Sequence, residues 1–443
     1  MYALSLSHHV HFSTNIASIF PRVLPTAGPP LLQHDLAFSV LWVLVTDRRG
    51  ELSLSFDVSV VNYQPAWLAQ SVERETLNLK VCGGCAPTDP APPNQRTGPV
   101  RGARNPIRSS IPWGKSSVNH KQLPTMSPAA TNGSSARKLV SGVYVPVTTF
   151  FKDDADQSLD LETQKKHSVY LAQCGCKGIV VQGSTAEAVF LTREERAQIT
   201  RATRQALDEA GFHDTLVISG CGYLSTKQTI DYCQDAGKEG ADYVLVLPPS
   251  YYPMLTTKEI LKQYYQDVAE ASPIGVMVYN FPGIMNGVDM DSDLIIDIAS
   301  SNKNIVGCKL TCSSVGKMTR IAATFSQEEF FVMSGATDLF ISSLMAGAEA
   351  AITGMGNIAP KTLVKCHRLW AEGNYKEAKK LGQMLSKAEY PILKHFIPGS
   401  KYVMDKYYGY GGKPRRPLLP AGKEMIQELD EKLKGIMEYE KSL

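Results

Sequence analysis

Residues 140–443 alternate between short segments that are apolar at nearly every position and longer segments that are apolar on one face only. The short apolar segments span residues 143–151, 178–182, 215–219, 243–247, 275–279, 305–309, 330–333 and 350–353. Runs that are apolar throughout, instead of at every second position, indicate strands buried on both faces, which is typical of parallel sheets. The pattern therefore predicts eight parallel strands.

The segments between these strands carry helix start signals. Three capping boxes are present: Thr192-x-x-Glu195, Ser225-x-x-Gln228 and Thr256-x-x-Glu259. Eight strand–helix units in succession predict the α/β class and a closed (β/α)8 barrel, the TIM-barrel architecture. An open doubly wound sheet is the alternative, but it needs a glycine-rich turn after its first strand, and residues 148–151 contain no glycine.

Further helical segments follow the eighth unit, at residues 375–386, 389–395 and 400–408. They predict a helical appendage at the C-terminal end of the barrel. We expect a barrel domain over residues 126–365 and C-terminal helices over residues 366–443.

Residues 1–125 differ from the rest of the chain. They hold half of the 26 prolines, and 11 Lys and Arg against 7 Asp and Glu, so the net charge of +3 originates here. Only residues 38–46 and 52–61 look strand-like, and residues 66–74 resemble a conceptual translation of tRNA-gene DNA. We expect this segment to be a gene-model artefact before Met126 or to be disordered; a genuine targeting extension is the alternative.

Composition excludes several classes of function. No run of about 18 apolar residues is present, so we expect no membrane-spanning helix, and a net charge of +3 is too small to predict nucleic-acid binding. Dispersed histidines and the absence of nucleotide-binding fingerprints predict neither a metal nor a cofactor. The nine cysteines comprise the pair Cys82 and Cys85 and seven scattered through the rest of the chain. Without a secretory signal or a regular cysteine framework, they predict the cytoplasm, with mitochondria as the alternative.

Candidate chemistry lies at the ends of the predicted strands, where barrel enzymes carry their active sites. Lys309 ends an apolar strand, and desolvation there would favour the neutral, nucleophilic amine that Schiff-base chemistry requires. A lysine that extends to solvent from the strand end is the alternative. Tyr279 ends the preceding strand and is either a proton relay or a core aromatic residue.

Two loops add weaker signals. The turn Gly183-Ser184-Thr185-Ala186-Glu187 precedes a capped helix, and its backbone N–H groups and hydroxyls could face a carboxylate. Residues 248–253, Pro-Pro-Ser-Tyr-Tyr-Pro, form a stiff loop with two tyrosines. An ordinary turn and surface packing are the alternatives.

Taken together, the GSTAE, PPSYYP, YNFPG and GCKLT motifs resemble the dihydrodipicolinate synthase / N-acetylneuraminate lyase family of pyruvate-dependent class I aldolases. The resemblance covers residues 138–418 and implies a metal-independent carbon–carbon lyase. The resemblance implies that Lys309 is the Schiff-base lysine and that Tyr279 is the general acid/base. Ser184 and Thr185 would be the hydroxyl pair that binds the substrate carboxylate, and Tyr251 would be a relay tyrosine that crosses a dimer interface. The backbone of Gly183, Gly335 and Ile352 would line the substrate pocket.

The resemblance also implies a small 2-keto acid as substrate and a homo-oligomer, dimer or tetramer. Ile284 stands where dihydrodipicolinate synthases carry an arginine for a second carboxylate, which argues against that activity. The YNFPG motif is similar to that of fungal 2-keto-3-deoxy-sugar-acid aldolases, which cleave L-threo-3-deoxy-hexulosonate to pyruvate and L-glyceraldehyde. Residues 397–418 are more similar to 4-hydroxy-2-oxoglutarate aldolases, which yield glyoxylate. A catalytically idle binding homologue is the third alternative.

Overall fold

The computed structural model describes residues 38–46, 52–60 and 137–443. The chain divides into two units, residues 1–117 and 118–443. In the first unit, β1 (Phe38–Thr46) and β2 (Leu52–Val60) pair antiparallel along their full length. This confirms the two strand-like segments; the other expectations for residues 1–125 lie outside the described residues.

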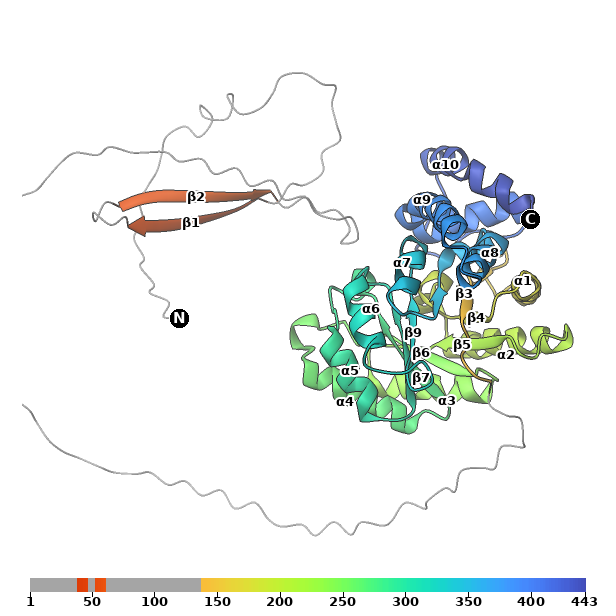
Figure 1. The fold of residues 1–443 in the computed structure, drawn as a ribbon, viewed down its shortest axis with the longest axis horizontal. Coiled ribbons are helices and arrows are strands. Elements are labelled where there is room, and N and C mark those ends of the chain that lie inside the picture. Colours follow the sequence, from red (N-terminus) through yellow and green to blue (C-terminus); the bar gives the residue numbers. More distant parts are fainter. Residues whose placement is uncertain (1–37, 47–51, 61–136) are drawn as a thin grey trace, which may run out of the picture. The chain divides into compact units, whose positions relative to one another are not determined.

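Parallel strands close into a barrel in residues 137–443 (Figure 1). The barrel strands are β3 (Gly142–Pro146), β4 (Gly178–Val181), β5 (Leu216–Gly220), β6 (Tyr243–Val246), β7 (Gly275–Asn280), β8 (Ile305–Leu310), β9 (Phe331–Ser334) and β10 (Ala350–Ile352). They neighbour one another in sequence order, and β10 closes the ring against β3. The predicted barrel is confirmed, and only the first strand is markedly shorter than expected.

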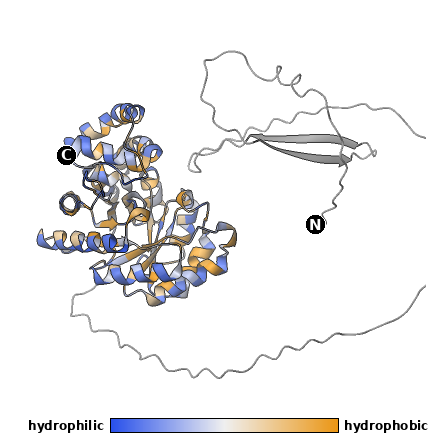
Figure 2. Cartoon of the chain, turned by 180° about the vertical axis from the view of Figure 1, so that it is seen from behind, coloured by the Kyte–Doolittle hydropathy of each residue, from blue (hydrophilic) through white to orange (hydrophobic). Residues whose placement is uncertain are grey.

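Each barrel strand is apolar at most of its positions because it has two buried faces. One set of side chains, including Met277, Met333 and Ile352, forms a cluster inside the barrel. The intervening residues, such as Val276, Val278 and Val332, pack outward against the helices. In Figure 2 the surrounding helices accordingly carry both hydrophilic and hydrophobic residues. The continuous apolar runs in the sequence reflect this double burial.

A helix follows each barrel strand. These helices are α1 (Leu161–Gln173), α2 (Arg193–Glu209), α3 (Thr226–Lys238), α4 (Lys258–Ala271), α5 (Ser292–Ser301), α6 (Val315–Ala322), α7 (Phe340–Met345) and α8 (Pro360–Ala371). The capping box of Thr192 and Glu195 is present at α2. The capping box predicted at Thr256 and Glu259 is wrong. The side chain of Thr257 caps α4 by accepting a hydrogen bond from the Ile260 N–H, whereas the Thr256 hydroxyl donates to the Tyr252 carbonyl.

Two helices follow the barrel, α9 (Tyr375–Tyr408) and α10 (Lys423–Lys441), which lie together beside α8 in Figure 1. Non-helical backbone at Phe396 breaks α9, two residues before Pro398. The expected helices at 375–386 and 389–395 are therefore continuous, and the third begins after this break. The sequence analysis missed α10. No helix in the described residues is long and apolar enough to cross a membrane.

Candidate active site

Lys309 and Tyr279 lie side by side at the carboxyl end of the barrel. They are direct neighbours in the register of β8 and β7. Tyr279 belongs to the cluster inside the barrel, so the lysine beside it faces the interior as well. The side-chain nitrogen of Lys309 lies 4.2 Å from the centre of the Tyr279 ring. The solvent-exposed alternative for Lys309 is excluded, because the residue is only 4% exposed.

Lys309 differs from the other two buried lysines of residues 137–443. Lys317 pairs with Asp289 at 2.5 Å, and Lys401 pairs with Glu187 at 2.6 Å. Within this part of the chain, Lys309 has no carboxylate partner and no hydrogen bond within the protein. Lys309 is therefore the buried lysine of residues 137–443 whose side-chain nitrogen is not paired with a carboxylate, which suits a role as a nucleophile.

The turn after β4 lies across the barrel mouth from Lys309, since β4 and β8 are on opposite sides of the ring. Ser184 and Thr185 form a short 3-10 helix there, with Gly183 as its first cap. The Ser184 hydroxyl is buried and has no hydrogen-bond partner in the structure. Thr185 is 9% exposed and lies near Gly354, which follows β10. An unpaired buried hydroxyl is the expected feature of a site that binds a polar ligand.

Gly335 directly follows β9, and Ile352 is the last residue of β10. Ile352 is fully buried inside the barrel. The N–H of Gly335 donates to the Leu310 carbonyl at 2.8 Å, so this N–H is already paired. A side chain at Gly335 would lie 1.8 Å from Oγ1 of Thr311. Glycine is therefore required here by the close approach of the neighbouring loop.

Thr311 is a candidate that the sequence analysis missed. It comes two residues after Lys309, and its buried hydroxyl has no hydrogen-bond partner in the structure. The signal was present in the sequence, because residues two apart in a strand lie on the same face. Ser184 and Thr311 thus offer two unpaired hydroxyls at opposite sides of the barrel mouth.

Tyr251 does not reach the lysine within one chain. It lies in the loop between β6 and α4, is 65% exposed, and stacks edge-to-face on the equally exposed Tyr252. Met254 and Leu255 of the same loop are exposed as well. The loop presents an apolar surface of a kind that commonly marks a contact with another protein.

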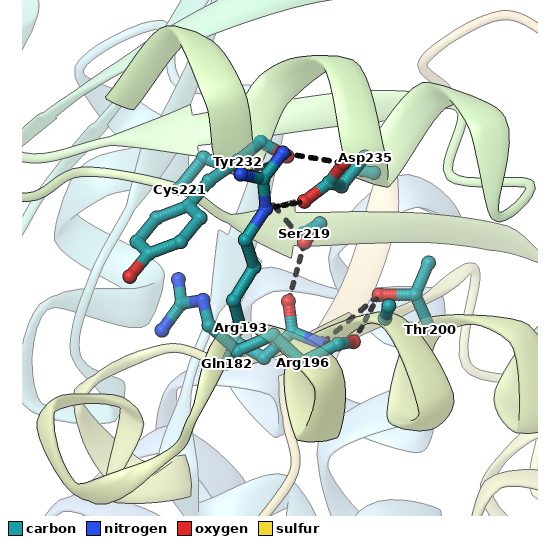
Figure 3. A pocket seen from close by; sticks show the side chains of 10 residues that line it. Gln182, Arg193, Arg196, Thr200, Ser219, Cys221, Tyr232 and Asp235 are labelled. Carbon is teal, nitrogen blue, oxygen red and sulfur yellow. Dashed lines mark hydrogen bonds and ion pairs between the residues drawn. The ribbon is translucent and has the colours of Figure 1, made fainter. Parts of the chain in front are cut away.

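A separate small cavity lies outside the barrel, between α2 and α3 (Figure 3). Its volume is about 10 Å³, which is enough for one water molecule. Arg196 lines this cavity, and its guanidinium stacks on the Tyr232 ring at 4.4 Å. Among residues 137–443, no group of three His, Cys, Asp or Glu residues is arranged to hold a metal ion.

The fold and the site define an enzyme class, the (β/α)8-barrel enzymes with a buried lysine as candidate nucleophile. The chain belongs to the dihydrodipicolinate synthetase family, which it matches over residues 139–436. This confirms the resemblance found in the sequence and the assignment to the carbon–carbon lyases.

Several fungal proteins are similar to this chain. L-threo-3-deoxy-hexylosonate aldolase of Aspergillus niger is 41% identical over 325 residues, which cover 68% of this chain and 96% of that protein. A protein of Emericella nidulans named "Probable 4-hydroxy-2-oxoglutarate aldolase, mitochondrial" is 43% identical over 307 residues, 69% of this chain and 98% of that protein. The crystal structure of a dihydrodipicolinate synthase family protein from Coccidioides immitis superposes with a TM-score of 0.63 at 37% identity, covering 69% and 99%.

Proposed function

We propose that the protein is a Schiff-base aldolase that reversibly cleaves a 2-keto-3-deoxy sugar acid, such as L-threo-3-deoxy-hexulosonate, to pyruvate and L-glyceraldehyde. The observation that carries this proposal is Lys309, a buried lysine without a counter-charge in the described chain, next to the Tyr279 ring. The Aspergillus niger relative, whose name gives this activity, supports the choice of substrate.

The mechanism follows from these two side chains. The neutral amine of Lys309 attacks the C2 carbonyl of the substrate to give a carbinolamine. The Tyr279 phenol gives its proton to the departing hydroxyl group, so that water leaves and an iminium ion remains beside the Tyr279 phenolate. The phenolate of Tyr279 takes the proton of the C4 hydroxyl, the C3–C4 bond breaks, and its electron pair moves into the iminium to form an enamine. The aldehyde leaves, C3 is protonated, and hydrolysis releases pyruvate and the free lysine.

The turn after β4 is the proposed site for the substrate carboxylate. The hydroxyls of Ser184 and Thr185 and the backbone from Gly183 onward would hold its oxygens, with Gly335 and Ile352 lining the wall at β9 and β10. The unpaired Ser184 hydroxyl supports this assignment. Fixing the carboxylate places the C2 carbonyl toward the Lys309 amine, which lowers the entropic cost of Schiff-base formation.

A second candidate function is cleavage of 4-hydroxy-2-oxoglutarate to pyruvate and glyoxylate, as the name of the Emericella nidulans relative suggests. That substrate carries a second carboxylate. Residues 281–290, which follow β7, contain no Lys, Arg or His, and Ile284 stands where dihydrodipicolinate synthases carry their arginine. The nearby cation Lys317 is neutralised by Asp289. These observations favour the sugar acid.

We also propose that the enzyme is a homo-oligomer in which Tyr251 reaches the active site of a second copy. The exposed apolar loop that carries Tyr251 supports this arrangement. A cytoplasmic location is part of the proposal, with mitochondria as the alternative given the name of the Emericella nidulans relative. An active monomer in analytical ultracentrifugation would remove Tyr251 from the mechanism.

The test is trapping with pyruvate and borohydride followed by peptide mapping. The reduced pyruvyl group should be found on Lys309 and not on the ion-paired Lys317 or Lys401, which serve as internal controls. Lys309→Ala should abolish both the adduct and substrate cleavage while the protein remains folded. A panel of both keto acids, with identification of the aldehyde released, then separates the two candidate substrates. A folded protein without the adduct contradicts the proposal.

A further inference from the structure

The turn from Gly183 to Ala186 is flanked on both sides by residues in the left-handed backbone conformation. Gln182 has φ 54° and Glu187 has φ 57°, and neither is glycine. This conformation is unfavourable for residues with a side chain, and it persists only where the surroundings impose it. The side chains of Gln182 and Glu187 should therefore be held firmly, and both are buried.

Gln182 is held by the barrel itself (Figure 3). Its amide nitrogen donates to the Thr200 hydroxyl at 2.9 Å, and its amide oxygen accepts from the Ser219 hydroxyl at 2.5 Å. Thr200 belongs to α2 and Ser219 to β5, which are the helix and the strand that follow β4 in the sequence. This end of the turn is thus fixed by local contacts within the barrel.

Glu187 is held by the C-terminal part of the chain. The side chains of Glu187 and Lys401 are both fully buried, and Lys401 Nζ lies 2.6 Å from Glu187 Oε1. The backbone N–H of Arg415 donates to Glu187 Oε2 at 2.6 Å. Lys401 also donates to the carbonyl of Lys413 at 3.0 Å. One carboxylate therefore ties the end of the turn to two separate points of the C-terminal segment.

Arg415 is itself clamped to the barrel. Its guanidinium donates to both carboxylate oxygens of Glu195 at 2.6 and 2.7 Å. It also stacks on the Phe151 ring at 4.3 Å, and Lys401 lies over the same ring at 4.5 Å. Bidentate arginine–carboxylate pairs have a defined geometry, so the N–H of Arg415 is presented to Glu187 in a fixed position.

We infer that Lys401 and Arg415 are positioning residues for the carboxylate-binding turn and act through Glu187. The inference rests on the proposed function, in which Ser184 and Thr185 hold the substrate carboxylate. Glu187 comes only two positions after Thr185, so a rotation of the backbone at Glu187 would shift the hydroxyls of Ser184 and Thr185. A displacement of about 1 Å in a binding group can cost a large factor in reactivity.

The experiment measures the pyruvate concentration that gives half-maximal borohydride trapping on Lys309, and the maximal extent of trapping. The first variant is the double substitution Glu187→Gln/Lys401→Met. It removes both members of the buried ion pair, so that neither charge is left buried without its partner. The second is Arg415→Lys, which removes the fork to Glu195. Glu440→Gln is the matched control: Glu440 is a buried carboxylate of α10 that binds the start of α8.

We expect the half-maximal pyruvate concentration to rise about tenfold or more in the first variant and to a smaller extent in Arg415→Lys. Maximal trapping per folded molecule should stay unchanged, as should both quantities in Glu440→Gln. A merely structural role would lower the maximum and leave the half-maximal concentration unchanged. That outcome in either folded variant overturns the inference, whereas absence of trapping in the wild type overturns the proposed function instead.

Discussion

His167 in α1 should make the protein lose stability in mild acid. The imidazole is fully buried. Its Nε2 lies 3.0 Å from Oδ1 of Asn357, and its Nδ1 lies 3.2 Å from the Tyr410 hydroxyl. The Asn357 amide nitrogen donates to the carbonyls of Pro146 and Gly354, so Oδ1 faces the histidine and accepts from Nε2. Nδ1 is then the acceptor for Tyr410, and the ring is neutral.

Burial lowers the pKa of His167 from 6.5 to about 4, against a smaller opposing effect of the bond to Asn357. The unfolded chain therefore binds a proton more readily than the folded one between these two values. Above pH 6.5, His167 is neutral in both the folded and the unfolded chain, and its titration does not change the free energy of unfolding. As the pH falls from 6.5 toward 4, proton binding by the unfolded chain lowers the free energy of unfolding. Linkage gives a loss of about 2.5 kcal/mol between pH 7.5 and 4.5.

The assay is urea denaturation at pH 7.5 and 4.5 for the wild type, His167→Gln and His213→Gln. His167→Gln should be less stable than the wild type at pH 7.5, because its bonds to Asn357 and Tyr410 are altered. Its loss of stability on acidification should be about 2.5 kcal/mol smaller than that of the wild type. His213→Gln makes the same substitution at an exposed histidine and serves as the matched control. Equal losses in the wild type and His167→Gln would refute the reasoning.

Three further substitutions test the site. Tyr279→Phe keeps the ring beside Lys309 but removes the phenol, so the cleavage rate should fall about 100-fold or more while the pyruvate adduct still forms; a rate near that of the wild type would remove Tyr279 as the base. Gly335→Ala should lower the free energy of unfolding by about 1–3 kcal/mol in chemical denaturation, because its methyl group collides with Thr311; unchanged stability would show that the loop can move aside. Tyr251→Ala should shift the sedimentation profile toward smaller species, and an unchanged profile would argue against an interface at this loop.

The barrel could be predicted from sequence because double burial produces an unambiguous pattern. Seven of the eight predicted strands agree with the structure to within one residue at either end. Lys309 and Tyr279 could be found because charge or a hydroxyl at the end of an apolar strand is conspicuous. Helix α10 was missed although Leu429, Leu433 and Ile436 follow helical spacing and are buried in the structure.

The support of the turn after β4 could not be predicted. Glu187 stands within a recognisable motif, but nothing near it in sequence identifies its partners. Lys401 lies in a segment that was predicted only as a helix, and Arg415 lies in a segment that stands out only by its resemblance to the family. Their pairing with Glu187 depends on how α9 returns to the barrel, which in turn depends on the break at Phe396. Contacts of this kind emerge from tertiary packing and have no local signature.

The contact between Glu187 and Arg415 joins residues that are 228 positions apart. During synthesis on the ribosome, every barrel strand emerges before Arg415 does, so the barrel can begin to fold before the turn receives its last support. The binding site would then mature only when the chain is nearly complete. A transcript truncated after Ile352 would encode every barrel strand, together with Lys309 and Tyr279, and still leave Glu187 without both of its C-terminal partners, Lys401 and the N–H of Arg415.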